Sequence, residues 1–210
     1  MFINFEGVDG SGKTSVINAI TTYLKNQGYD LEITREPGGT SISEQIRTIL
    51  LNPNNTEMYP LAEAYLYAAS RAQHVFEKIL PALKKNKIVI TDRFVHSSLA
   101  YQGIVKKLGL EFVLNLNRPA INETLFPDIT FILDVPAEIA RARMSKDVTR
   151  VADRFDQESA LFHQQVRDAF KTVAQTYNSD KAKIFIIDAS KPLEAVVQNI
   201  LDILLPLLRL

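Results

Sequence analysis

The chain has 210 residues, of which 46% are hydrophobic and 23% are charged, and its 24 basic residues balance its 24 acidic residues. This length suits one domain with a buried core, and the neutral balance argues against a large basic face for nucleic acid. Cysteine is absent, which excludes a disulfide framework, a cysteine nucleophile and a cysteine-based metal site.

Five short apolar runs predict β-strands at residues 2–5, 31–34, 88–91, 129–135 and 184–187. Most of them are near-continuous in Ile, Val, Leu and Phe, which is typical of strands that are buried on both faces. Between them, apolar residues recur at helical spacing, and Ser41 with Glu44 predicts a capping box at the start of one helix. This alternation predicts an α/β fold of three layers, with a five-stranded parallel sheet flanked by helices.

Targeting signals are not evident in the sequence. The first six residues lack the basic region of a signal peptide, and no apolar run reaches the ~20 residues that a membrane helix needs. We therefore expect a cytoplasmic protein, with neither a membrane nor a nucleic acid as its partner.

A glycine-rich loop follows the first predicted strand. It reads Gly7-Val8-Asp9-Gly10-Ser11-Gly12-Lys13-Thr14, which fits the pattern G-x-x-x-x-G-K-[ST] between a strand and a helix. The backbone N–H groups of such a loop curl round phosphate oxygens, and the start of the helix adds partial positive charge. Lys13 is predicted to reach the β- and γ-phosphates, and the Thr14 hydroxyl to bind Mg²⁺. The motif predicts a P-loop NTPase-type fold, without distinguishing a kinase from an ATPase or a GTPase.

An acidic residue ends the third predicted strand. Ligands of parallel sheets bind beyond the carboxyl ends of the strands, where Asp92 and Arg93 lie. Asp92 is predicted to hold Mg²⁺ through water and Arg93 to pair with a phosphate. The alternative is a solvated pair of charges on a loop.

With these residues in place, the sequence resembles the thymidylate kinases of the bacterial kind. The matching segments are residues 5–14, 34–40, 66–74, 92–103 and 127–135, in the order and spacing of that family. The segments at residues 35–40 and 97–103 are specific to it among nucleoside monophosphate kinases. The resemblance implies transfer of the γ-phosphoryl group of ATP to dTMP, giving dTDP and ADP in dTTP biosynthesis, with Mg²⁺. It also implies a homodimer, for which the helical stretch after Met58 is a candidate face.

The resemblance implies a group of residues around the phosphate and sugar of dTMP. Arg35, Arg47 and Arg93 match family positions near the dTMP phosphate, where a planar guanidinium pairs with two oxygens at once. Asp9 matches the acid that accepts a hydrogen bond from the sugar 3′-hydroxyl. Glu36 is expected to support the sugar or to order water round Mg²⁺.

Base recognition is implied for another group. Tyr67 matches the aromatic that stacks on thymine, where the family commonly has Phe, and Arg71 and Gln102 match the groups that hydrogen-bond the pyrimidine. Ser98 is a further polar contact. Tyr101 matches a ring packed against C2 of the sugar, which would clash with a ribose 2′-hydroxyl.

Two residues after Asp92 depart from the family pattern. Phe94 stands where Tyr is usual, and His96 stands where a polar or acidic residue is expected. We expect His96 to be a histidine of a surface loop rather than a pH-sensitive contact.

The predicted domain covers residues 1–210, with a lid at about residues 141–155. Residues 141–154 contain five basic and two acidic residues. The family has two designs, one with an arginine in the phosphate loop and one with arginines in the lid, and Gly10 in the loop matches the second. Arg143 and Arg154 are therefore candidates for closing on the ATP phosphates, with Arg150 a weaker one. The alternative is a solvated helix with charges paired along one face.

Two other functions remain open at this level. The chain could phosphorylate another monophosphate or a deoxynucleoside, or it could be a non-enzymatic ATP-binding module. A module would need Lys13 and Thr14 without an acceptor site. The joint presence of five acceptor-site residues argues against it: Arg47, Arg71, Asp92, Arg93 and Gln102.

Overall fold

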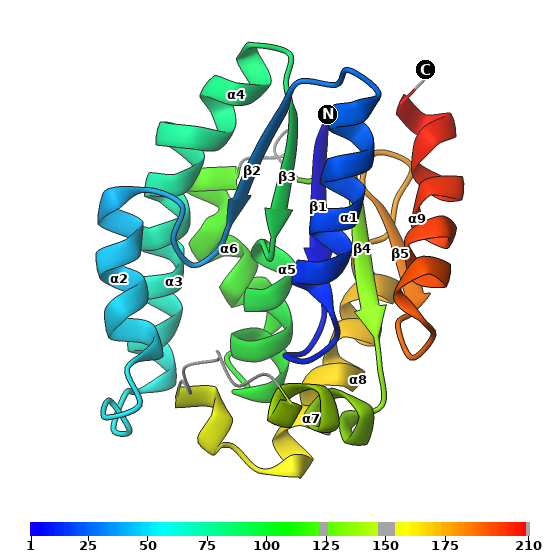
Figure 1. Cartoon of the computed structure of the whole chain (residues 1–210). Helices are drawn as coiled ribbons and strands as arrows, with labels where there is room; N and C mark the ends of the chain where they lie inside the picture. Colours follow the sequence, from blue (N-terminus) through cyan, green and yellow to red (C-terminus); the bar gives the residue numbers. More distant parts are fainter. Residues whose placement is uncertain (122–125, 147–153, 209–210) are drawn as a thin grey trace.

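The computed structural model describes residues 1–121, 126–146 and 154–208 (Figure 1). A five-stranded sheet runs through it in the order β2-β3-β1-β4-β5, and all neighbouring strands are parallel. The predicted fold class is confirmed, and each predicted strand overlaps an observed one. The strands are β1 (Phe2–Glu6), β2 (Leu31–Arg35), β3 (Ile88–Asp92), β4 (Ile129–Asp134) and β5 (Lys183–Asp188).

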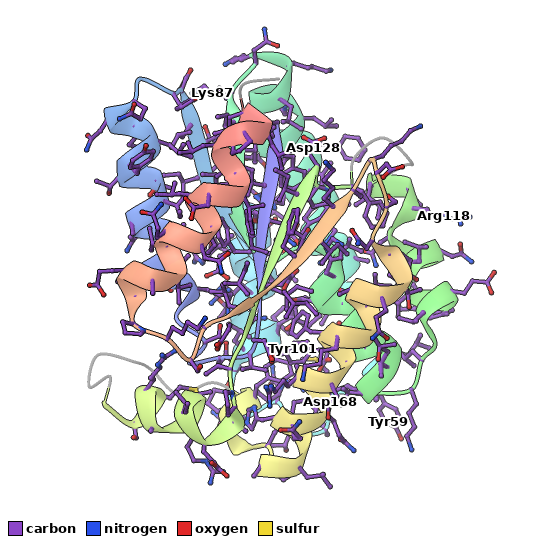
Figure 2. All side chains as sticks on the ribbon, turned by 90° about the vertical axis from the view of Figure 1, so that its right-hand side faces the viewer. Tyr59, Lys87, Tyr101, Arg118, Asp128 and Asp168 are labelled. Carbon is purple, nitrogen blue, oxygen red and sulfur yellow. The ribbon has the colours of Figure 1, made fainter. Side chains whose placement is uncertain are left out.

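Helices cover both faces of the sheet. Figure 2 shows α1 (Lys13–Asn26) and α9 (Leu193–Leu208) on one side and α8 (Ala160–Tyr177) on the other. Residues of β1 are therefore buried on both sides, which explains the near-continuous apolar run at residues 2–5. The remaining helices are α2 (Ser41–Leu51), α3 (Pro60–His74), α4 (Leu80–Lys84), α5 (Val95–Ser98), α6 (Leu110–Ile121) and α7 (Ala137–Lys146).

Three short segments complete the described elements. They are two π-helical stretches, η1 (Val75–Ile79) and η2 (Leu99–Val105), and a 3₁₀ turn, η3 (Arg154–Gln157). Segment η2 continues α5 directly and carries Tyr101 and Gln102. A π-helical turn contains one more residue than an α-helical turn, so side chains along η2 point in directions that a regular helix would not give them.

The predicted capping box is displaced by one residue. Helix α2 begins at Ser41, but Thr40 is its N-cap and accepts a hydrogen bond from the Ser43 amide. Glu44 reaches back to the Gly39 amide at 2.8 Å and pairs with Arg35 at 2.9 Å. The prediction of Ser41 as the cap is therefore wrong, because Thr40 offers the same hydroxyl in an extended conformation one residue earlier.

The expectation of a surface position for His96 is also wrong. The side chain is 1% exposed, its ring packs edge-on against Phe126, and its Nδ1 lies 3.3 Å from the Asn4 amide nitrogen. Burial, with a smaller contribution from the charge of Arg71, lowers the pKa of His96 to about 3. At neutral pH the imidazole is therefore uncharged.

A buried neutral histidine makes stability depend on acid. In the unfolded chain His96 takes up a proton below about pH 6.5, whereas the folded chain resists protonation until about pH 3, so stability falls as the pH drops between these values. We expect His96→Asn, which keeps an acceptor near the Nδ1 position, to reduce this dependence by up to about 1.4 kcal/mol per pH unit. Urea unfolding at about pH 7 and about pH 5 measures it. If the free energy of unfolding changes equally between the two pH values in the variant and in the unmodified chain, a neutral buried His96 is contradicted.

The carboxyl ends of the five parallel strands lie together at one end of the sheet, where ligands of such folds bind. Figure 1 shows α7 and η3 beyond the carboxyl ends of the strands, while β1 begins at the opposite end of the sheet. In the described parts of the chain, no helix combines the length and the apolar character that crossing a membrane requires.

Candidate active site

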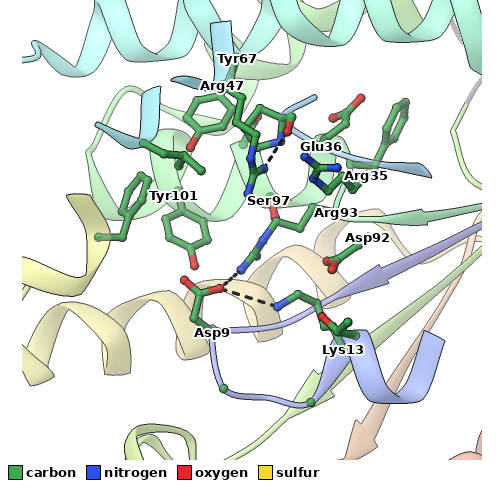
Figure 3. A pocket seen from close by; sticks show the side chains of 18 of the residues that line it. Asp9, Lys13, Arg35, Glu36, Arg47, Tyr67, Asp92, Arg93, Ser97 and Tyr101 are labelled. Atoms are coloured by element: carbon green, nitrogen blue, oxygen red, sulfur yellow. Dashed lines mark hydrogen bonds and ion pairs between the residues drawn. The ribbon is translucent and has the colours of Figure 1, made fainter. Parts of the chain in front are cut away.

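One cavity of about 490 Å³ opens at the carboxyl ends of the strands (Figure 3). The glycine-rich loop forms one wall, α2, α3 and η2 form others, and α7 contributes Arg143. Most of the predicted site residues line it: Asp9, Gly10, Gly12, Lys13, Thr14, Arg35, Glu36, Arg47, Tyr67, Arg71, Asp92, Arg93, Ser98, Tyr101, Gln102 and Arg143. Gly7, Val8, Ser11 and Arg154 do not line it, and Arg150 lies outside the described residues.

The glycine-rich loop is held in a shape that only small residues permit. Gly7, Gly10 and Gly12 all have positive φ, at 141°, 77° and 91°. A Cβ on Gly10 would overlap the backbone of Ala140 in α7. The loop and the predicted lid helix are thus in backbone contact, and Gly10 is required there for close approach as well as for its φ.

The side chain of Lys13 contacts the glycine-rich loop that precedes it in the sequence. Its Nζ donates to the carbonyl oxygens of Gly7 at 3.0 Å and Val8 at 3.1 Å, and it lies 4.0 Å from the Asp9 carboxylate. Burial lowers the pKa of the Lys13 ammonium, and so does the charge of Arg93, although nearby acids oppose them. A phosphate at this position would offer the ammonium a stronger partner than backbone carbonyls.

Arg93 bridges the loop and the third strand. It has a left-handed φ of 71°, and its guanidinium donates to Asp9 at 2.6 Å, Gly7 at 2.9 Å and Ser97 at 3.2 Å. In Figure 3, dashed lines join the Asp9 carboxylate to both Lys13 and Arg93. Burial by itself lowers the pKa of the Arg93 guanidinium. The electrostatic effect of Tyr101, Asp9 and other nearby acids is larger, and it raises the pKa well above its ordinary value. The guanidinium is therefore a permanent positive charge at the wall of the cavity.

Glu6 is a buried residue beside the site, to which the sequence assigned no role. It is fully buried at the end of β1 and accepts hydrogen bonds from the amides of Phe94 and Ser97 and from the Ser97 hydroxyl, at 2.8, 3.1 and 2.6 Å. Burial raises the pKa of its carboxyl, against the charge of Arg93. Glu6 thereby fixes the segment that follows Asp92, including the unusual backbone of Arg93. Its only sequence signal is a charged residue at the end of an apolar run.

The Asp92 carboxylate suits a cation. Its Oδ1 is buried and has no hydrogen-bond partner within residues 1–121, 126–146 and 154–208. A buried carboxylate oxygen in this state is costly unless a ligand satisfies it. No group of three or more acidic or histidine side chains surrounds it in the described part of the chain, so a metal ion here would take most of its ligands from water and phosphate. The Thr14 hydroxyl lines the same cavity.

Arg71 is held by a buried polar network. Its Nε donates to Glu36 at 2.8 Å, and its Nη1 donates to Ser98 at 3.1 Å and Asn117 at 2.5 Å. The other oxygen of Glu36 lies 3.0 Å from His74 Nδ1. Glu36 lines the cavity and contacts Arg71, and its predicted role toward the sugar or toward water round Mg²⁺ stays a prediction. His74 lies one turn after Arg71 on α3, within the matching segment at residues 66–74, whereas Asn117 lies 46 residues from Arg71 and no local pattern indicated it.

The other two predicted phosphate ligands lie near the mouth of the cavity. Arg47 donates to the Pro37 carbonyl at 2.8 Å, whereas Arg35 pairs with Glu44 and is half exposed. Burial lowers the pKa of Arg47, and the charge of Arg35 lowers it further. An anion between these two guanidinium groups would relieve their mutual repulsion.

The two described arginines that are candidates for the ATP phosphates lie in different places. Arg143 donates to the carbonyl oxygens of Ala189 at 2.9 Å and Ser11 at 3.5 Å, so it lies against the glycine-rich loop. Arg154 is buried, donates to the Leu50 carbonyl at 3.1 Å and forms an ion pair with Glu63. The structure therefore brings Arg143 to the loop and does not bring Arg154 there.

Known proteins resemble this chain over nearly its whole length. The family profile described as thymidylate kinase matches residues 5–200. A thymidylate kinase of Geobacillus sp. (strain WCH70) is 46% identical over 93% of this chain and 91% of its own, and one of Latilactobacillus sakei is 48% identical over 96% and 93%. The crystal structure of thymidylate kinase from Ehrlichia chaffeensis superposes with a TM-score of 0.76 at 31% identity, covering 97% and 98% of the two chains. The chain belongs to the thymidylate kinase family.

Proposed function

We propose that the cavity performs the reaction of this family, transfer of the γ-phosphoryl group of ATP to dTMP, with its lining residues in the roles that follow. The observation that carries the proposal is that one cavity joins the Lys13 loop, which suits a nucleoside triphosphate, to a cluster of guanidinium groups beside Tyr67 and Gln102. A module that only binds ATP does not require the cluster of guanidinium groups beside Tyr67 and Gln102.

On the donor side, the amides of residues 7–12 and the Lys13 ammonium bind the β- and γ-phosphates. Thr14 and Asp92 hold Mg²⁺, and the unpartnered Oδ1 of Asp92 supports this role. When bound, Mg²⁺ neutralises charge on the phosphates. Lys13 then exchanges its contacts with Gly7 and Val8 for phosphate oxygens.

On the acceptor side, Arg35, Arg47 and Arg93 bind the dTMP phosphate and oppose the repulsion between two polyanions. Hydrogen bonds hold Arg93 against Asp9 and Gly7 of the loop that binds ATP, and its side chain also lines the cavity that receives dTMP. Asp9 accepts a hydrogen bond from the 3′-hydroxyl of the sugar.

The base site combines a stacking ring with two hydrogen-bonding groups. Tyr67 stacks on thymine, Arg71 donates to O4, and Gln102 and Ser98 contact the polar edge. Arg71 suits this role because Glu36 and Asn117 fix its guanidinium before the ligand arrives. Cytosine carries an amino group in place of O4 and would meet the Arg71 donors unfavourably.

The lid at about residues 141–155 closes over ATP and excludes water. Arg143 is the first of its cations, which its position on the loop supports. Arg154 joins only if it leaves Glu63. Arg150 is a third candidate, and we infer no geometry for it.

A homodimer forms part of the proposal. Helix α2, helix α3 and the residue that precedes α3 expose several large apolar side chains, which a partner copy would cover. They are Ile42, Ile49, Tyr59, Leu61 and Tyr65, and the last three follow Met58.

Tyr101 is expected to select deoxyribose. Its ring lines the cavity and is supported by Arg93 at 5.7 Å and by Phe155 at 5.6 Å. Tyr101→Ala would open space for a 2′-hydroxyl and lower the preference for dUMP over UMP by about 10-fold or more, whereas Tyr101→Phe would keep the preference. Relative kcat/KM for the two acceptors measures this change. Undiminished discrimination in Tyr101→Ala would remove the steric argument.

A panel of acceptors tests the proposed function. ADP formation from ATP is measured with dTMP, dUMP, dCMP, AMP and GMP in turn. We expect dTMP to be the best acceptor, with residual activity on dUMP, because one methyl group contributes only about 1–3 kcal/mol of discrimination. ATP binding without turnover on any acceptor would support a binding module instead.

A further inference from the structure

Glu63 is a buried carboxylate to which no role has been assigned so far. It lies in the first turn of α3, one turn before Tyr67, and its exposed fraction is 0%. Three donors share its two oxygens. Gln102 Nε2 donates to Oε1 at 2.7 Å, while Lys106 Nζ at 2.8 Å and a nitrogen of Arg154 donate to Oε2.

This arrangement fixes the orientation of the Gln102 amide. A carboxylate beside two cations can only accept hydrogen bonds, so the Gln102 group that faces it must be the NH₂ group. The carbonyl oxygen Oε1 of Gln102 then points away from Glu63. Because Gln102 also lines the cavity, it presents an acceptor to the ligand.

We propose that Glu63 is a positioning residue that makes Gln102 a hydrogen-bond acceptor for the base and thereby selects bases that carry a proton on N3. The inference rests on the proposed function, in which Gln102 contacts the base. Thymine offers an N–H at N3 and an acceptor at O4, which complement the Gln102 oxygen and the Arg71 donors. Cytosine offers the reverse at both positions. Glu36 thus orients the Arg71 donors toward O4, and Glu63 orients the Gln102 acceptor toward N3.

The separate partners of the two oxygens give a specific expectation for Glu63→Gln. The new amide oxygen is drawn to the Oε2 position, because Lys106 and Arg154 both donate there. The new NH₂ group then occupies the Oε1 position and faces Gln102, which has to turn its own oxygen toward residue 63. The Gln102 NH₂ group enters the cavity and opposes the N3 proton of thymine.

The test is the ratio of kcat/KM for dTMP to kcat/KM for dCMP. Glu63→Gln should lower it by about 10- to 100-fold, the factor that one mismatched buried hydrogen bond costs. The ratio should fall without inverting, because Arg71 still rejects the cytosine amino group. The KM for ATP should stay unchanged, a split that a general loss of structure would not produce.

A swapped pair provides the decisive variant. In Glu63→Gln combined with Gln102→Glu, the new NH₂ group donates to one oxygen of residue 102, and the other oxygen is again an acceptor toward the base. The preference for dTMP should return. If Glu63→Gln alone does not fold, the swap tests the proposal by itself, since it keeps one carboxylate and one amide in the cluster.

Lys106→Met is the matched control. It removes a cation from Oε2 and leaves the bond between Gln102 and Oε1 in place, so the ratio should not change. An unchanged ratio in Glu63→Gln, or a swap that folds without the preference for dTMP, would overturn the role of Glu63. Failure of the unmodified chain to prefer dTMP would instead overturn the proposed function.

Discussion

Arg143→Ala is expected to lower kcat about 10³-fold, the scale on which loss of a catalytic arginine acts in phosphoryl transfer. Among the described residues, Arg143 donates to two backbone carbonyls, those of Ser11 and Ala189, which a guanidinium readily exchanges for phosphate oxygens. The loop that Arg143 touches has no cation at position 10, where Gly10 leaves room for the backbone of α7. In the proposed mechanism the lid therefore supplies an additional charge for the transferred group, through Arg143.

Arg141→Ala is the control for this prediction. Arg141 lies on the same helix and is exposed, and it does not line the cavity. Both variants lose one positive charge from α7, so a difference between their kcat values isolates the position of the guanidinium. Steady-state kinetics at saturating ATP and dTMP gives the comparison. If Arg143→Ala keeps the kcat of Arg141→Ala, the lid arginine has no part in the transfer.

Arg93→Met is expected to lower kcat by about 10²- to 10³-fold, because it removes a fixed positive charge from the cavity wall, where we propose that the two phosphates meet. Three hydrogen bonds hold that charge before any substrate binds, and an acidic environment keeps it ionised. The methionine retains most of the volume of the arginine stem, so the cavity wall is preserved. The unfolding midpoint should be measured beside kcat, because Asp9 loses one of its partners.

Arg93→Lys serves as the graded control. It keeps the charge but cannot reach Gly7, Ser97 and Asp9 together, so we expect an intermediate kcat. If Arg93→Lys is as slow as Arg93→Met, geometry matters more than charge. If Arg93→Met retains the kcat of the unmodified chain, Arg93 does not stabilise the transferring phosphate.

The parts of the fold that depend on local pattern were predictable. A strand buried on both faces must be apolar throughout, and the loop at residues 7–14 requires glycines at positions of positive φ. The strand order was not predictable from such local rules, because pairing of β1 with β3 and β4 depends on crossovers between distant segments. The cap of α2 was misplaced by one residue because Thr40 and Ser41 both carry a suitable hydroxyl.

The buried acids of the site show where local reasoning fails. Glu6 holds the Arg93 segment, Glu36 holds Arg71 and Glu63 holds Gln102, and each is less than 5% exposed. A charged residue is normally assigned to the surface unless its partners are known. Those partners lie 35 to 91 residues away from these acids, so only the folded chain reveals them. His96 was misassigned for the same reason, since Asn4 and Phe126 enclose it.

The most direct test of the account follows the phosphoryl group itself. The chain is supplied with dTMP, Mg²⁺ and ATP labelled at the γ-phosphate, and the products are separated. The account predicts that the label moves to the β-phosphate of dTDP, with one ADP formed for each dTDP. Release of the label as inorganic phosphate, with dTMP unchanged, would contradict it.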